Sequence, residues 1–201
     1  MSNKYFQKTI EAVVLKWQGN TPLSTLHEDD YFSLKNSLEE TRYIYLTQNQ
    51  LPQRWLKQVA EPENLSFTIV DTGFRTGLNF LTTWQAWQQS PEPKRTLNFI
   101  SIEKNPLKKD DLIRSLAHWS ELNNLSQELI NQYPYPTQGS HLLSFDNGKV
   151  KLQLIFGDVN SDLETYSFIA DCWFLDGFSS TKKNSMWTKS LFNLMACRAH
   201  S

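Results

Sequence analysis

The segment Asp71–Gly77, with the sequence DTGFRTG, places the strongest constraint on how this chain of 201 residues can fold. It directly follows the apolar run 67–70 and precedes residues 78–87, in which leucine and tryptophan recur at helical spacing. Glycines in a turn between a strand and a helix let the backbone approach a ligand that a Cβ would exclude, and the helix that follows offers unpaired N–H groups. The sequence therefore predicts a site for a nucleotide-like cofactor at this turn.

The rest of the chain repeats this alternation of apolar strands and amphipathic helices. Strands are predicted at 67–70, 97–102, 150–156 and 172–175, and helices at 77–90, 107–116 and 187–195. The polar stretch 123–148 is expected to hold a helix and a loop. Each strand ends in a glycine or an acid, which is typical of an α/β fold with a doubly wound, mostly parallel sheet and a site at the carboxyl ends of its strands.

The first part of the chain is less regular. Residues 1–64 are expected to form a small mixed subdomain that packs on the core, and residues 65–201 the core itself. Apolar and polar residues alternate in short segments at 12–17 and 42–46, and apolar residues recur at helical spacing near 51–59. The division at residue 64 rests on the polar link 62–64.

Composition excludes several classes of protein. The net charge of −1 gives no overall attraction to nucleic acid, although Lys182, Lys183, Lys189 and Arg198 near the end suit either a polyanionic substrate or a solvated helix face. Cys172 and Cys197 lie in apolar and helical runs and are expected to be buried. The four histidines lack ligand spacing, so we expect no metal. We find no signal peptide or membrane span, and a cytoplasmic location is the expectation.

Three carboxylates at strand ends are candidate site residues, each with a structural alternative. Glu103 could accept hydrogen bonds from the hydroxyls of a ribose, or it could be an ordinary acid near a helix N-terminus. Asp158 could accept a hydrogen bond from the amino group of adenine, or it could cap the following turn. Asp176 ends the most apolar strand, where ligands converge in this architecture, so a functional role is favoured for it.

Four segments identify the family that this chain resembles. They are FTIVDTGFRTGLNFLTTWQAW, LNFISIEKNPLKKDDL, LIFGD and WFLDGFSSTKKNSMWTKSLF. They resemble the methyltransferase domain of the bacterial tRNA 5-methylaminomethyl-2-thiouridine biosynthesis proteins, the MnmC family, and the run 24–55 is similar too. The resemblance implies a Rossmann-like class I enzyme that uses S-adenosylmethionine to methylate the aminomethyl group of 5-aminomethyl-2-thiouridine at the wobble position of tRNA.

The same resemblance implies roles for individual residues. Asp176 would be catalytic and would hold the substrate amine near the methyl donor, with Gly177, Phe178 and Tyr31 in the substrate pocket. The cofactor residues would be Asp71, Gly73, Thr76, Gly77, Glu103 and Asp158. The first four would surround the methionine part, Glu103 would bind the ribose, and Asp158 would face the adenine.

Two departures from the family pattern leave alternatives open. Arg75 stands where the family usually has a glycine, so its side chain could fill cofactor space or could pair with the carboxylate of the cofactor. The family fold continues beyond Ser201, so we expect a C-terminally incomplete sheet whose fourth strand is an uncovered edge, and an absent oxidase half with no FAD. The alternative functions are an inactive remnant that binds cofactor or RNA, and a dinucleotide-dependent oxidoreductase.

Overall fold

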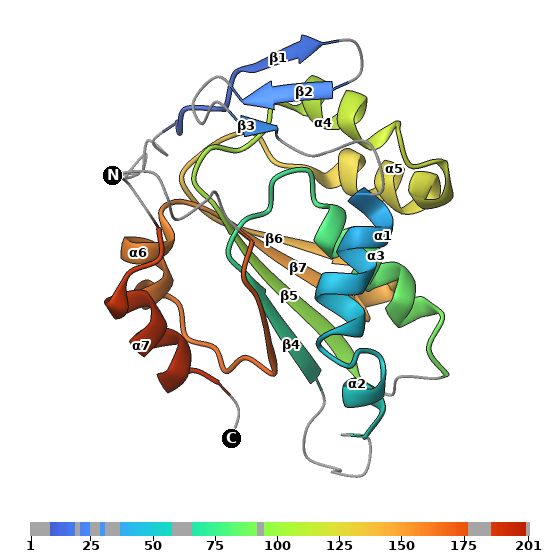
Figure 1. Cartoon of the computed structure of the whole chain (residues 1–201), viewed down its shortest axis with the longest axis vertical. Helices are drawn as coiled ribbons and strands as arrows, with labels where there is room; N and C mark the ends of the chain where they lie inside the picture. The colour runs from blue at the N-terminus through green and yellow to red at the C-terminus, as the bar shows by residue number, and fades with distance from the viewer. Residues whose placement is uncertain are drawn as a thin grey trace, which may run out of the picture.

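A five-stranded sheet forms the centre of the molecule (Figure 1). The computed structural model describes residues 9–18, 21–24, 29–30, 37–57, 66–91, 95–176 and 186–199. The strand order is β6-β7-β5-β4-β8, and every neighbouring pair is parallel except β6 with β7. The strands are β4 Ser66–Asp71, β5 Thr96–Glu103, β6 Gly139–Phe145, β7 Val150–Phe156 and β8 Cys172–Phe174.

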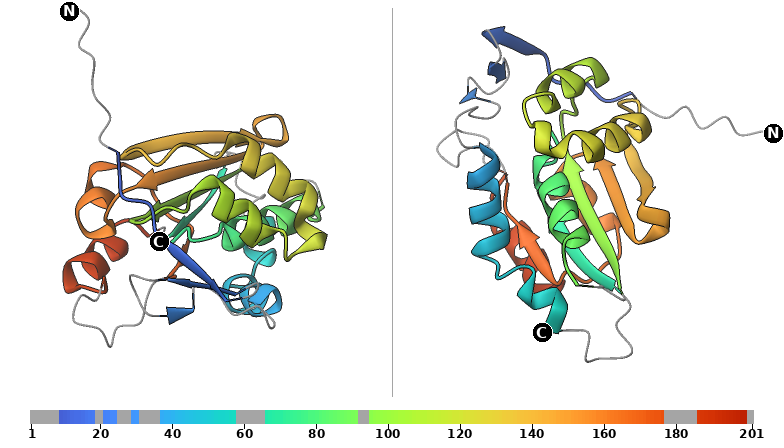
Figure 2. Two further views of the ribbon diagram at one scale, coloured as in Figure 1. Left: turned by 90° about the horizontal axis from the view of Figure 1, so that it is seen from above. Right: turned by 90° about the vertical axis from the view of Figure 1, so that its right-hand side faces the viewer.

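Helices cover both faces of this sheet (Figure 2). Alternating residues of β4 point to opposite faces, so Phe67 and Ile69 join one apolar cluster and Val70 joins the other. The first cluster includes residues of α3 Leu78–Gln88, α4 Lys109–Leu116, η3 Ser120–Leu122 and α5 Asn123–Gln132. The second includes residues of α6 Val159–Asp162, η5 Leu163–Thr165 and α7 Lys189–Cys197. A short helical turn, η4 Asp146–Gly148, joins β6 to β7.

The N-terminal region packs against the core. Its strands form a small antiparallel sheet in the order β1-β2-β3, and three helical segments follow. Their bounds are β1 Leu15–Gln18, β2 Thr21–Ser24, β3 Asp29–Asp30, α1 Ser37–Thr41, η1 Arg42–Thr47 and α2 Gln53–Lys57. Leu46 and Trp55 are buried in the same apolar cluster as Phe67 of β4, and Val13 donates its backbone N–H to Pro106 O at 3.1 Å. The division at residue 64 remains a prediction.

The predicted α/β class is confirmed, and so are the four predicted strands and the buried stripe along α3. One strand was missed, because β6 falls in the polar stretch 123–148 that was expected to hold a helix and a loop. Its side chains are alternately half-buried and exposed over residues 139–142, and it pairs antiparallel at the edge of the sheet, so it carries no continuous apolar run.

Two further predictions need correction. The segment 42–46 is helical, within η1, and not a short alternating piece. Cys197 is exposed, whereas Cys172 is buried as predicted. Helical spacing places Cys197 in the last turn of α7, where Leu191 and Met195 supply the buried face.

β8 lies at the other edge of the described sheet, next to β4. The segment just before β8 is paired, because Ala170 forms a parallel bridge with Ala199 and donates its N–H to Arg198 O at 2.7 Å. None of the described helices is long and apolar enough to cross a membrane.

Candidate functional site

The turn that follows β4 lies directly against the segment that follows β8. Thr72 donates its backbone N–H to Phe174 O at 3.1 Å and its hydroxyl to Asp176 O at 2.7 Å. A Cβ on Gly73 would lie 2.8 Å from the same Asp176 oxygen, closer than real Cβ contacts come. Glycine at position 73 therefore permits the close approach that brings Asp176 to the turn.

The turn ends at Gly77, which is the N-cap of α3 and has a left-handed backbone with φ of 77°. A Cβ at this position would lie 2.7 Å from the ring of Phe74. Gly77 donates its N–H to Phe74 O at 2.7 Å, and the preceding Thr76 is buried. Both predicted glycines are thus required by the geometry of the turn.

Glu103, at the end of β5, reaches across to this turn. One carboxylate oxygen accepts the backbone N–H of Arg75 and the other accepts that of Asn105, each at 2.8 Å. Burial raises the pKa of Glu103 above its ordinary value, although the hydrogen bonds from Arg75 and Asn105 oppose the shift. Each oxygen keeps a second lone pair that could accept a ligand hydroxyl.

Asp71, the last residue of β4, is fully buried beneath the turn. It accepts the hydroxyl of Ser101 at 2.6 Å and the side-chain amide of Asn79 at 3.2 Å. Burial raises the pKa of Asp71 well above its ordinary value, and the nearby charge of Asp176 raises it further. A cation bound in this cluster would therefore relieve a real electrostatic cost.

Asp176 completes the cluster. Its Oδ2 accepts the side-chain amide of Asn79 at 3.0 Å, and its Oδ1 forms an ion pair with Nη1 of Arg75 at 3.4 Å. The side chain of Asp176 is 17% exposed, so it stays accessible to a ligand. Asn79 bridges Asp71 and Asp176, and so holds the two carboxylates in one site.

The first helical region of the chain also contributes to this site. The ring of Tyr45, in η1, lies 5.0 Å from the ring of Phe174. Burial raises the pKa of the Tyr45 phenol, and the negative charges of Asp176 and Asp71 raise it further. The side-chain amide of Asn79 acts in the opposite direction, so the phenol lies near the amide that holds the carboxylates.

Asp158 follows β7 on the same edge of the sheet. It accepts the backbone N–H of Asn160 at 2.9 Å, as the N-cap of α6, and pairs with Nζ of Lys104 at 2.7 Å. Burial opposes its ionisation, but the hydrogen bonds from Lys104 and Asn160 outweigh burial and lower the pKa of Asp158. The capping alternative is therefore present in the structure, and an adenine contact remains a prediction.

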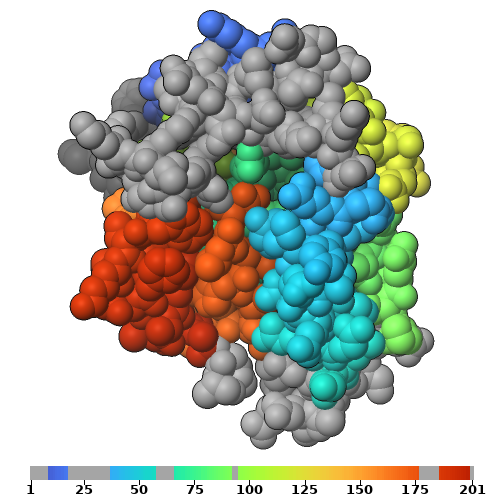
Figure 3. Space-filling view, in the orientation of Figure 1, coloured from blue at the N-terminus to red at the C-terminus, as the bar shows by residue number. Residues whose placement is uncertain are grey.

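The structure brings together most of the residues predicted for the site. Asp71, Gly73, Glu103 and Asp176 converge on one turn, whereas Gly177, Phe178 and Tyr31 lie outside the described residues. In the face shown in Figure 3, a recess lies above β8, between the red α7 and the blue and cyan α1–η1 region, and green atoms of the β4–α3 region are visible in it. Among the described residues, no group of three His, Cys, Asp or Glu side chains could hold a metal ion.

Sequence reasoning missed Asn79 and Tyr45. Asn79 lies in the first turn of α3, immediately after the glycine turn, and an amide among apolar residues there was the available signal. Tyr45 comes from η1, far from the turn in sequence, and nothing local pointed to it.

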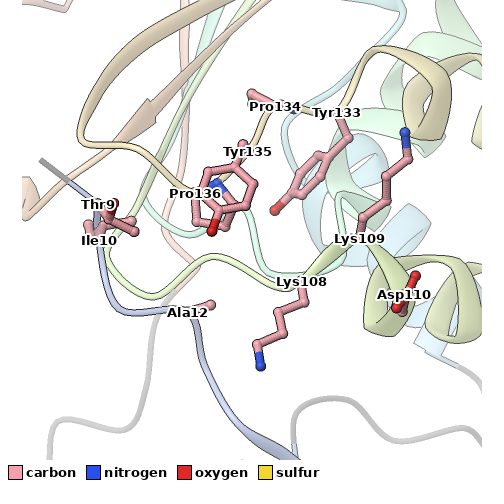
Figure 4. A pocket seen from close by; sticks show the side chains of 10 residues that line it. All are labelled: Thr9, Ile10, Ala12, Lys108, Lys109, Asp110, Tyr133, Pro134, Tyr135 and Pro136. Atoms are coloured by element: carbon pink, nitrogen blue, oxygen red, sulfur yellow. The ribbon is translucent and has the colours of Figure 1, made fainter. Parts of the chain in front are cut away.

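A separate cavity of about 560 Å³ lies between the start of α4, the segment before β6 and the N-terminal segment (Figure 4). Tyr133 and Tyr135 line it together with Lys108 and Lys109, whose side chains extend in different directions. None of the site residues predicted from the sequence lines this cavity.

Comparison with known families places residues 120–201 in a family described as S-adenosyl-L-methionine-dependent methyltransferase. Together with the mostly parallel sheet and its helices on both faces, this match defines the class of the chain as an α/β S-adenosyl-L-methionine-dependent methyltransferase fold. The cofactor of this class is S-adenosylmethionine, as predicted. The match favours methyl transfer over the alternative of a dinucleotide-dependent oxidoreductase.

Within this class, the predicted resemblance to the MnmC family is confirmed. The chain is 45% identical over 186 residues to the tRNA 5-methylaminomethyl-2-thiouridine biosynthesis bifunctional protein MnmC of Methylobacillus flagellatus, and the match covers 92% of this chain. It is 41% identical to the protein of the same name from Aliivibrio fischeri, over 96% of this chain. The chain spans only 28% and 29% of the lengths of these two relatives.

A solved structure supports the fold independently. The crystal structure of MNMC2 from Aquifex Aeolicus superimposes with a TM-score of 0.68 at 19% identity, and the match covers 94% of this chain and 57% of that one. At this identity the likeness concerns the fold alone.

Proposed function

We propose that this chain transfers a methyl group from S-adenosylmethionine to the primary amine of 5-aminomethyl-2-thiouridine at the wobble position of tRNA. The observation that carries this proposal is the convergence of Asp176 with Glu103 and the glycine turn. Asp176 offers a carboxylate to an amine at the place where the other two features suit a nucleoside cofactor. The names of the MnmC relatives supply the tRNA and the modified base.

The residues of the site suit the proposed cofactor. The turn has no Cβ at Gly73, where one would collide with Asp176 O, and Glu103 has lone pairs left for ribose hydroxyls. Three carboxyl groups, Asp71, Glu103 and Asp176, lie together, and burial and the charge of Asp176 make ionisation of Asp71 and Glu103 costly. A cofactor with a sulfonium and an ammonium group would stabilise their ionised forms.

S-adenosylmethionine supplies an activated methyl group on a sulfonium, so the protein has to align and deprotonate the amine. An alkylamine is mostly protonated at neutral pH, and its ammonium form would bind to the carboxylate of Asp176. Asp176 then accepts or relays one proton, which frees the nitrogen lone pair. With S-adenosylmethionine bound, the nitrogen would displace the methyl group from its sulfonium, which would leave a secondary ammonium and S-adenosylhomocysteine.

The test is radiolabelled methyl transfer to tRNA that carries 5-aminomethyl-2-thiouridine at the wobble position, with this exact chain as the enzyme. We expect wild-type protein to label the tRNA, and Asp176→Asn to lose roughly a hundredfold or more of the turnover while it still binds cofactor. Asp110→Asn is the matched control, because Asp110 is an exposed acid in the first turn of α4 and contacts none of the site carboxylates in the structure. Cofactor binding would be measured by calorimetry on all three proteins.

Each outcome separates the candidate functions. Full turnover in Asp176→Asn would remove Asp176 from the mechanism. Cofactor binding without any transfer by the wild type would favour the alternative of a cofactor- or RNA-binding module. Labelling of tRNA that already carries the methylaminomethyl group would mean that the primary amine is not the acceptor that the enzyme requires, and would contradict the proposed substrate.

A further inference from the structure

Arg75 has an unusual backbone for an arginine. Its φ is 51°, in the left-handed region that non-glycine residues occupy at a cost. Such conformations persist only where the surrounding structure holds them in place, and they are found most often at active sites and ligand sites. Here the backbone N–H of Arg75 is held by Glu103 at 2.8 Å, so the same strained residue is tied to the carboxylate proposed to bind the ribose.

The side chain of Arg75 is directed into the carboxylate cluster. Its Nη1 lies 3.4 Å from Oδ1 of Asp176, and a quarter of the side chain is exposed. The contact is a single one at the long end of the hydrogen-bonding range, whereas arginine binds carboxylates best through two parallel bonds. A carboxylate that is placed to form two bonds could therefore replace Asp176 as the partner of Arg75.

The charges of the site define what that carboxylate would be. S-adenosylmethionine carries two cationic groups and one carboxylate. Asp71, Glu103 and Asp176 attract the cationic groups but repel the carboxylate, and Arg75 is the described cation that contacts this cluster. We propose that Arg75 is the anchor for the carboxylate of the cofactor, and that it exchanges Asp176 for this carboxylate when the cofactor binds.

The exchange has a consequence for the order of binding. In the cofactor-free protein, the guanidinium of Arg75 occupies one oxygen of Asp176, which is the group proposed to receive the substrate amine. Binding of the cofactor withdraws that cation and leaves Asp176 open to the amine. This inference rests on the cofactor part of the proposed function and does not depend on the tRNA substrate.

The test compares two ligands in two proteins by calorimetry. S-adenosylhomocysteine carries the amino acid carboxylate, whereas 5′-methylthioadenosine has the same adenosine and sulfur but no amino acid part. We expect Arg75→Gln to weaken the binding of S-adenosylhomocysteine roughly ten- to a hundredfold. The affinity for methylthioadenosine should stay within about twofold of the wild-type value. Arg75→Lys keeps the charge and should recover part of the loss. Arg114→Gln, at an exposed arginine over the ring of Trp17, is the control and should change neither affinity.

The outcomes are distinct from those of the methyl-transfer assay, because no tRNA is present. Equal weakening of both ligands by Arg75→Gln would mean that Arg75 shapes the turn and binds no carboxylate, which would overturn the proposal. Unchanged affinity for S-adenosylhomocysteine would overturn it too. Binding of methylthioadenosine by the variant also reports that the variant is folded.

Discussion

At the scale of single residues, Arg75 combines a conformational cost with a charge, and two substitutions separate them. Arg75→Gln removes the charge but keeps a Cβ at φ of 51°, whereas Arg75→Gly removes both. We expect Arg75→Gly to be more stable than Arg75→Gln by about 0.5–1 kcal/mol, since relief of the left-handed strain exceeds the added entropy of glycine in the unfolded chain. Urea unfolding of both variants measures this difference. A glycine variant less stable than the glutamine variant would show that no strain is stored at this position.

Which site residues could be predicted from the sequence follows from where they lie. Asp71, Glu103 and Asp176 each end an apolar strand, and the carboxyl ends of parallel strands meet at one edge, so their convergence could be inferred from local patterns. Asn79 could not be inferred in this way, because its role comes from bridging two carboxylates that only the folded chain brings together. The same holds for the ion pair of Arg75 with Asp176.

At the scale of elements, η1 links the N-terminal region to the site. Arg42 in this segment donates to Gln85 of α3 at 2.8 Å and to Glu121 of η3 at 2.7 Å. Tyr45, one turn later, places its ring against Phe174. π-helical segments such as η1 are rare and often occur at functional sites, which agrees with this placement.

Two substitutions at Tyr45 test whether η1 positions Asp176. Tyr45→Phe keeps the ring contact with Phe174 and should lose less than about 1.5 kcal/mol of stability. Tyr45→Ala removes the ring, and we expect a loss of about 2–3 kcal/mol in the free energy of unfolding. Turnover in the methyl-transfer assay should fall roughly ten- to a hundredfold in Tyr45→Ala, because small displacements of a catalytic group are costly. Equal turnover in both variants and wild type would show that η1 has no part in positioning Asp176.

Elements were predictable where their pattern was self-contained. The parallel strands are mostly buried and rich in apolar residues, so β4, β5 and β7 were predicted within one residue of their bounds. The antiparallel strand β6 has one exposed face, and it pairs with β7 over residues 139–145. No local pattern in the sequence predicts this pairing. The helical form of 42–46 also depends on packing, since Leu46 is buried against the core while Tyr43 and Ile44 are exposed.

At the scale of the whole molecule, the buried carboxylates determine how stability responds to pH. Burial raises the pKa values of Asp71 and Glu103, so over a range above the ordinary carboxyl pKa of about 4 the folded protein holds protons that the unfolded chain has released. A group whose folded-state pKa is raised adds stability that is complete below its unfolded pKa and is lost as pH rises through its folded pKa. Asp158 acts in the opposite sense, because its lowered pKa adds stability above the ordinary range and loses it in acid.

We therefore expect the ligand-free protein to be more stable at pH 5.5 than at pH 8, as measured by urea unfolding at matched ionic strength. Asp71→Asn should flatten this dependence, because an amide at the most deeply buried position removes the ionisation that opposes folding, and its amide group can still accept from Ser101 or Asn79. Asp110→Asn, at an exposed acid of α4, should leave the slope unchanged.

Saturating S-adenosylmethionine should also flatten the slope of the wild type, since its cationic groups stabilise the ionised carboxylates most at the higher pH. An unchanged slope in Asp71→Asn would mean that the ionisation of the buried cluster does not control stability. The charge argument for the cofactor site would then lose its basis.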